Sequence, residues 1–262
     1  MTPTFQVAET ASSFWDDAGL PDAYPRDVRR AVVLTQPLSL VLLSELHVSG
    51  VLEWLRRQGR NLDMAVRDRP LRACLVARSG AGFIFVDGGD QESEQRYSIA
   101  HELAHFLLDY VAPRQEAVSR LGDEILDVLD GLRPETIAER AGALLTGVGA
   151  GAHVHLLGRS EEEAAAETID IAEARADALA LELLAPWADV STQIGAQGIG
   201  VERAAIVRLL TDHYGLPPVP ARRYAARFLP QRESSSALLR HLRATPRTSL
   251  PASGLRSSGG PR

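Results

Sequence analysis

The residues with the clearest chemistry are His101, Glu102 and His105, which form the run His101-Glu-Leu-Ala-His105. The surrounding segment, Tyr97 to Tyr110, is predicted to be a helix, on which residues four apart lie on the same face. Two imidazoles on one face can bind one zinc ion. The adjacent Glu102 carboxylate can take a proton from metal-activated water. The spacing therefore predicts a metal-dependent hydrolase, with peptidase chemistry favoured.

The alternative interpretation is a non-metallic helical protein in which the two histidines are ordinary residues of an amphipathic helix. His101 and His105 border the apolar stripe of this helix rather than its solvated side. A half-buried imidazole needs a partner for each ring nitrogen, and a metal ion together with a hydrogen-bond acceptor supplies both. Metal binding is therefore favoured. The apolar stripe consists of Ala100, Leu103, Ala104 and Leu107.

A catalytic zinc ion usually has three protein ligands, so a third ligand is expected elsewhere in the chain. One extended zincin pattern places Gly and His three and six residues after the second histidine. Leu108 and Val111 occupy these positions here, which excludes that class. The single cysteine, Cys74, lies in a predicted strand, so a cysteine-built zinc site is also excluded and Cys74 is expected to pack in the core.

The strongest candidate for the third ligand is Glu173, on a second predicted helix that begins near Ser160 and ends near Leu184. Glu173 falls inside the apolar face of this helix, where an unpaired carboxylate costs several kcal/mol. Asp177 follows one turn later, where it can accept the N–H of a zinc-bound histidine. A buried ion pair between Glu173 and an arginine is the alternative interpretation.

The segments before the histidines predict a small sheet. Leu71 to Ala77 and Gly82 to Asp87 are rich in β-branched and aromatic residues, and Ser79 to Gly82 is typical of a hairpin turn. A polar loop from Gly88 to Arg96 then leads into the histidine helix. An extended peptide substrate could pair with such a sheet edge beside the metal.

Taken together, these residues resemble the ImmA/IrrE family of bacterial metallo-endopeptidases, over roughly Leu71 to Leu229. The resemblance implies an α+β, gluzincin-like fold in which a small sheet packs on the histidine helix and on a second ligand-bearing helix. It implies zinc held by His101, His105 and Glu173, with Glu102 as the general base. Manganese is the alternative metal. Several members of the family cleave a helix-turn-helix repressor in a mobile-element or stress response, so such a repressor is the expected substrate.

The chain departs from the family in the spacing between its ligands. The 68-residue separation of His105 and Glu173 is longer than the family pattern. We therefore expect an insertion over residues 113–159, with helices at 116–130 and 134–146 and a short strand at 152–156. His153 and His155 share one face of that strand. A surface polar pair is favoured there, with oxyanion stabilisation or metal binding by these two histidines as the alternatives. Tyr97, Tyr110, His155 and His213 all stay open as oxyanion donors.

The remaining segments complete the expected domain organisation. Residues 1–26 are expected to be weakly ordered, residues 27–230 to form the zinc peptidase domain, and residues 231–262 to form a disordered tail. Leu38 to Arg57 is predicted to be one or two helices. The C-terminal part of the domain, residues 190–230, is predicted to contain a helix pair.

Composition excludes several other classes of protein. All basic residues are arginine, so Walker A loops and Schiff-base lysines are excluded. The net charge of −6 argues against direct nucleic-acid binding. The sequence lacks a long apolar span and a basic leader, so we expect a cytoplasmic protein without membrane contact. The alternative to an enzyme is a zinc-binding regulatory module without turnover, which binds a repressor or DNA.

Overall fold

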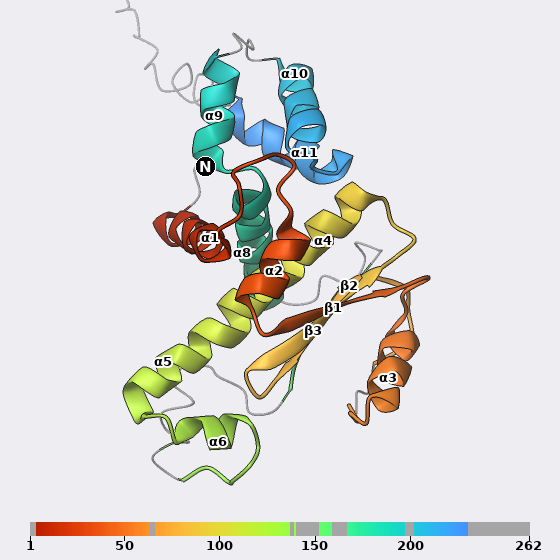
Figure 1. Cartoon of the computed structure of the whole chain (residues 1–262), viewed down its shortest axis with the longest axis vertical. Helices are drawn as coiled ribbons and strands as arrows, with labels where there is room; N and C mark the ends of the chain where they lie inside the picture. The colour runs from red at the N-terminus through yellow and green to blue at the C-terminus, as the bar shows by residue number, and fades with distance from the viewer. Residues whose placement is uncertain are drawn as a thin grey trace, which may run out of the picture. The chain divides into compact units, whose positions relative to one another are not determined.

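The computed structural model describes residues 4–62, 66–136, 139, 152–158, 167–196 and 202–229, and the main chain only of residues 167–170. These residues form the expected α+β fold, in which helices cover both faces of a four-stranded sheet (Figure 1). No helix within these ranges is long and apolar enough to cross a membrane.

The sheet has the strand order β1-β3-β2-β4. β1 pairs with β3 in parallel, whereas β2 pairs with β3 and with β4 in antiparallel orientation. The predicted hairpin is confirmed: Ser79 and Gly80 join β2 to β3 with φ angles of 52° and 78°. Two such residues give a turn whose twist matches that of the paired strands. The strand bounds are Leu38–Leu43 for β1, Leu71–Arg78 for β2, Ala81–Asp87 for β3 and His153–Gly158 for β4.

The strand β1 corrects the prediction of helix over Leu38 to Arg57. Only the second half of that segment is helical, as α3 (Val48–Arg57). The first half pairs along β3, with Leu38 opposite Gly82. A Cβ atom added at Gly82 would lie 2.8 Å from the Val76 oxygen and 3.0 Å from Leu38 Cδ2, so glycine permits this close strand approach. Pairing with an existing hairpin therefore outweighs the helix propensity of the leucines.

The N-terminal residues also differ from the prediction, because Phe5–Ala18 form helix α1 rather than a weakly ordered segment. Val7, Ala11 and Phe14 are buried at the spacing of one helix face. This face packs against helix α8 (Glu167–Leu184), and Trp15 Nε1 donates a hydrogen bond to the Leu183 oxygen at 2.9 Å. Burial of these apolar side chains stabilises the helix.

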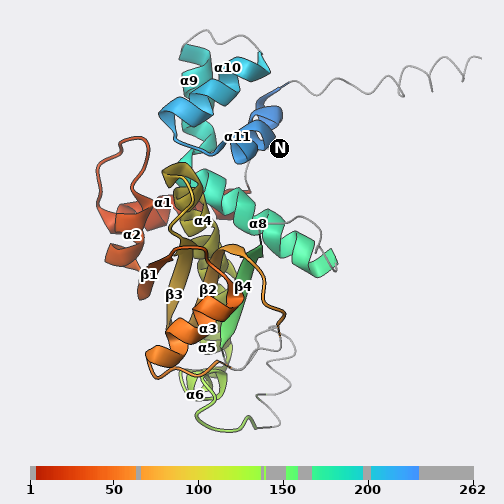
Figure 2. The same cartoon turned by 90° about the vertical axis from the view of Figure 1, so that its right-hand side faces the viewer.

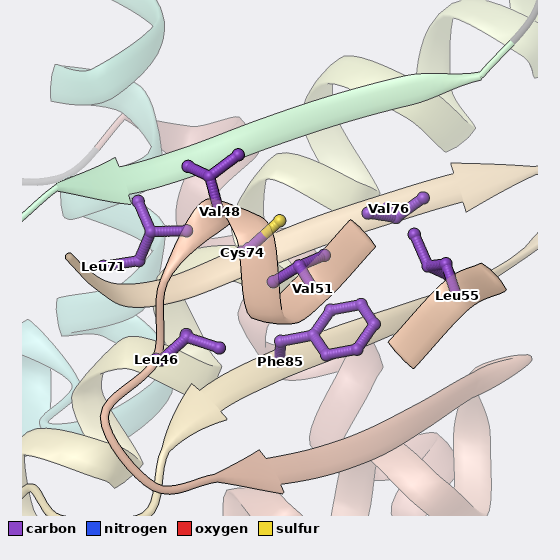
Figure 3. Packing of buried hydrophobic residues seen from close by; sticks show 8 residues of the cluster. All are labelled: Leu46, Val48, Val51, Leu55, Leu71, Cys74, Val76 and Phe85. Atoms are coloured by element: carbon purple, nitrogen blue, oxygen red, sulfur yellow. The ribbon is translucent and has the colours of Figure 1, made fainter. Parts of the chain in front are cut away.

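Two layers of helices enclose the sheet. Helix α4 (Glu92–His105) packs on β2 and β3 from one side, and α3 covers the opposite face (Figures 1 and 2). Cys74 is a buried free cysteine in the core beneath α3, as expected. Figure 3 shows this core, which consists of Leu46, Val48, Val51, Leu55, Leu71, Cys74, Val76 and Phe85.

The expected insertion begins as a continuation of α4. A wide π-helical turn, η1 (Phe106–Val111), leads into α5 (Ala112–Leu121), which ends before Gly122 with a φ angle of 83°. The predicted helix at 116–130 is therefore divided between α5 and α6 (Ile125–Leu129). The helix predicted at 134–146 falls largely outside the described residues. The predicted short strand at 152–156 is confirmed as β4.

The C-terminal helices pack through aromatic residues. The predicted helix pair is present, and Trp187 stacks on Phe228 with ring centroids 4.0 Å apart. The buried Tyr214 donates its hydroxyl hydrogen to Asp189 at 2.8 Å. The tail predicted for 231–262 is outside the described residues. The remaining elements are α2 (Val28–Thr35), α9 (Trp187–Ala196), α10 (Arg203–Arg208), η3 (Leu209–His213), α11 (Pro218–Ala225) and η4 (Ala226–Phe228).

Candidate metal centre

Helix α4 places His101, Glu102 and His105 in the interior of the protein. All three are buried, and Glu102 has no exposed surface. The four-residue spacing brings the Nε2 atoms of His101 and His105 to 3.2 Å from each other. The two imidazoles therefore face a common point, as their spacing in the sequence predicted.

Glu173 reaches the same point from helix α8, which lies against α4 (Figure 2). Its Oε2 atom is 3.3 Å from His101 Nε2, and its Oε1 atom is 3.6 Å from His105 Nε2. The side chain is 35% exposed, so it lies at the rim of the buried face rather than inside it. The structure thus brings the proposed third ligand together with both histidines.

The outer nitrogen of each histidine contacts a carboxylate. Asp177 Oδ1 lies 3.2 Å from His101 Nδ1 and also accepts the Tyr97 hydroxyl at 2.7 Å. Asp109 Oδ2 lies 2.7 Å from His105 Nδ1. Asp177 was expected at this place from the sequence and Asp109 was not. The four-residue spacing of His105 and Asp109, one helical turn, is the signal that could have identified Asp109.

This arrangement determines which atoms can bind a metal ion. If Asp177 and Asp109 accept the Nδ1–H groups, the Nε2 atoms of His101 and His105 present lone pairs to each other. Lone pairs and carboxylate oxygens this close repel one another unless a cation lies among them. Donor atoms of His101, His105, His155 and Glu173 all lie within 4.8 Å of one another. This nitrogen and oxygen set fits a divalent metal ion.

His155, on β4, does not lie at the surface position that the sequence predicted for it. The surface polar pair expected for His153 and His155 is wrong for His155, whose side chain is 16% exposed. Pairing of β4 with β2 places it against α4, where its ring stacks on His105 with centroids 3.7 Å apart. Its Nδ1 and Nε2 atoms lie 2.9 Å from Glu102 Oε2 and 2.7 Å from Glu173 Oε1, respectively.

The structure also separates the four oxyanion-donor candidates. The Tyr97 hydroxyl is engaged by Asp177, and the Tyr110 hydroxyl accepts the Gly80 N–H at 2.8 Å. His213 packs against the Tyr24 and Tyr214 rings. Of the four, only His155 lies within hydrogen-bond distance of both Glu102 and Glu173.

The carboxylates create an environment that favours positive charge. Burial alone would lower the pKa of His101, but hydrogen bonds with Asp177 and Glu173 outweigh it and raise the pKa to about 9. Burial likewise opposes protonation of His155, yet the charge and hydrogen bond of Glu102 raise its pKa to about 10. Burial raises the pKa of Glu173, but hydrogen bonds from the three histidines lower it overall.

The small mixed sheet, its helices and the cluster of histidines and Glu173 are consistent with a zincin-like domain. Residues 61–127 match the Peptidase_M78 family model, described as the IrrE N-terminal-like domain. This match confirms the resemblance to the ImmA/IrrE family metallopeptidases. It covers the hairpin, α4 and α5, and it ends before β4 and α8, so His155 and Glu173 come from outside the matched residues. No curated protein matches the chain.

Proposed function

We propose that the protein is a zinc-dependent endopeptidase that hydrolyses peptide bonds. One observation carries this proposal: His101, His105 and Glu173 direct donor atoms to a common point beside the buried carboxylate of Glu102. Zinc suits this mixed nitrogen and oxygen set, with manganese as the alternative. When bound, the ion supplies Lewis-acid activation of water and of the scissile carbonyl group.

Glu102 is the proton carrier in the proposed reaction. Its Oε2 atom contacts His155, whereas its Oε1 atom is buried without a hydrogen-bond partner among the described residues. An ionised carboxylate oxygen in this position can accept a proton from the attacking water. Glu102 then delivers that proton to the nitrogen of the leaving amine, which returns the carboxylate to its ionised form.

The sheet offers a place for an extended substrate. Among the described strands, β4 pairs only with β2 and forms one edge of the sheet. The main-chain groups along the outer side of β4 could pair with a peptide strand next to the metal centre. Main-chain pairing supplies affinity for a peptide without requiring a particular sequence.

We propose a helix-turn-helix transcriptional repressor as the substrate, cleaved at one site in a stress or mobile-element response. The family resemblance supports this substrate. Cleavage of a transcriptional repressor implies that the protein acts in the cytoplasm. Under this proposal the enzyme inactivates one repressor and does not degrade proteins in general.

The test combines metal analysis with a cleavage assay. The protein is purified without a histidine tag, its zinc content is measured, and it is incubated with candidate repressors encoded near its gene. We expect repressor fragments with the wild type and none with Glu102→Gln at equal zinc content. A stoichiometric complex without fragments, with zinc present, would instead support the regulatory module, and a protein that binds no metal would contradict both.

A further inference from the structure

Strand β4 brings a side chain into the metal centre from the long segment between the two ligand-bearing helices. In the antiparallel pairing with β2, His155 lies opposite Leu75 and His153 lies opposite Ala77. Residues two apart on a strand share a face. The ring contacts of His155 with His105 and of His153 with Tyr110 place this face towards α4 and η1.

His155 links two carboxylates that belong to different helices. Its Nδ1 atom is 2.9 Å from Glu102 Oε2 on α4, and its Nε2 atom is 2.7 Å from Glu173 Oε1 on α8. Both distances lie within the range of charge-assisted hydrogen bonds. One imidazole therefore fixes the separation of the proposed base and the proposed third ligand.

The contact between His155 and Glu102 also determines which oxygen of the Glu102 carboxylate is engaged. Glu102 is fully buried, Oε2 faces His155, and Oε1 has no hydrogen-bond partner in the described part of the chain. Burial of an unpartnered carboxylate oxygen is costly, so its persistence calls for a functional explanation. A carboxylate held through one oxygen keeps the other in a fixed direction.

We propose that His155 is a positioning residue of the metal centre, holding Glu102 with Oε1 free and Glu173 turned towards His101 and His105. This inference rests on the proposed peptidase function. It adds that residues 113–159, through β4, supply part of the active site.

The neighbouring His153 is a matched control. It lies on the same strand and the same face, two residues before His155. Its ring is next to Tyr110, with centroids 6.1 Å apart, and its Nε2 atom is buried without a hydrogen-bond partner among the described residues. A loss of strand stability should therefore follow from substitution of either histidine, whereas a loss of carboxylate positioning should follow only at His155.

The experiment compares His155→Phe with His153→Phe in the full chain. Phenylalanine keeps the aromatic ring that stacks on His105 and removes both nitrogen atoms. Each protein is loaded with Co²⁺, its visible absorption spectrum is recorded, and it is titrated with acetohydroxamate. This probe binds a metal ion and hydrogen-bonds a neighbouring carboxylate, so its affinity reports the position of Glu102 independently of any peptide substrate.

We expect H155F to bind one equivalent of Co²⁺ with an altered spectrum and an acetohydroxamate affinity reduced about 10-fold or more. We expect H153F to match the wild type in both measurements. An unchanged spectrum and affinity in H155F would overturn the inference. So would loss of Co²⁺ binding in a folded H155F, because His155 would then be a ligand.

If H155F does not fold, His155→Asn is measured in its place with the same expectations, because its shorter side chain cannot span both carboxylates. Failure of the wild type to bind Co²⁺ would contradict the proposed function itself. That result does not depend on position 155, so the two failures are distinguishable.

Discussion

At the residue scale, the chemistry depends on which side-chain atoms are engaged and which remain free. The Nδ1 atoms of His101 and His105 contact carboxylates, and their Nε2 atoms face Glu173. Glu102 is engaged through Oε2, and its Oε1 atom has no hydrogen-bond partner within the described ranges. The nitrogens proposed to bind metal and the oxygen proposed to accept a proton therefore belong to side chains that meet in one buried centre.

Replacement of Glu102 by glutamine should remove turnover without removing the metal. Glutamine has nearly the same shape but cannot accept a proton, so we expect activity to fall by about 10²- to 10⁴-fold. Zinc content, measured by mass spectrometry, and the circular dichroism spectrum should match the wild type. Cleavage at the wild-type rate would exclude Glu102 as the base.

Replacement of Asp109 by asparagine should weaken metal binding. The variant loses the charge beside His105 Nδ1, so we expect zinc affinity to fall by about 10- to 100-fold in competition with a chelator. Asp123→Asn, at an exposed position, is the control and should leave the affinity unchanged. Equal affinities in the two variants would show that Asp109 does not support His105.

Much of the metal centre could be predicted from the sequence, because helix periodicity is a local property that shows which residues share a face. His101 and His105 share a face by their spacing, and Glu173 was singled out as a carboxylate on an apolar face. His155 could not be placed in this way. Its environment depends on the pairing register of β4 and β2, which joins segments far apart in the chain.

At the element scale, each element is stable because of what it packs against. Helix α1 contacts α8, and α8 carries Glu173 and Asp177. The apolar spacing of Val7, Ala11 and Phe14 was visible in the sequence, but scattered prolines and aromatics nearby obscured it. The leucines of strand β1 also have a high helix propensity, and pairing with β3 is what stabilises the extended form.

Truncation of Phe14 should destabilise the whole protein if α1 is part of the packed fold. Phe14 is 3% exposed, so we expect Phe14→Ala to reduce the free energy of unfolding by about 3–5 kcal/mol. Phe5→Ala, at a position 83% exposed on the same helix, should change it by less than about 0.5 kcal/mol. Urea denaturation measures both values, and equal small effects would show that α1 does not contribute to stability.

The junction of α8 and α9 should have a pH-dependent stability. Glu182 is buried and accepts the Trp187 N–H at 3.1 Å, and burial raises the pKa of its carboxyl group. The folded protein therefore retains this proton to a higher pH than the unfolded chain does. Its contribution to stability is present below the ordinary pKa of the carboxyl group and is lost as the pH rises through the raised value.

Glu182→Gln keeps an oxygen acceptor for Trp187 and cannot ionise. We expect this variant to become more stable than the wild type as the pH rises from the ordinary pKa of the carboxyl group through the raised value. Denaturant midpoints measured across that range test the expectation. A difference between the two proteins that stays constant with pH would contradict it.

At the scale of the whole molecule, the α+β class was predictable and the sheet topology was not. The hairpin followed from its strand composition and turn residues, since those signals are local. The parallel addition of β1 and the antiparallel addition of β4 depend on long-range contacts. These additions matter for the proposed function, because β4 supplies His155 and the sheet edge proposed to pair with a substrate strand.

Our proposal requires that side chains from α4 and α8 share one divalent metal ion. Anomalous diffraction at the zinc absorption edge, from crystals of tag-free protein grown with zinc, tests it most directly. We predict one strong peak within coordination distance of His101 Nε2, His105 Nε2 and the Glu173 carboxylate. A zinc-bound crystal whose peak lies elsewhere, or out of reach of Glu173, would contradict the claim.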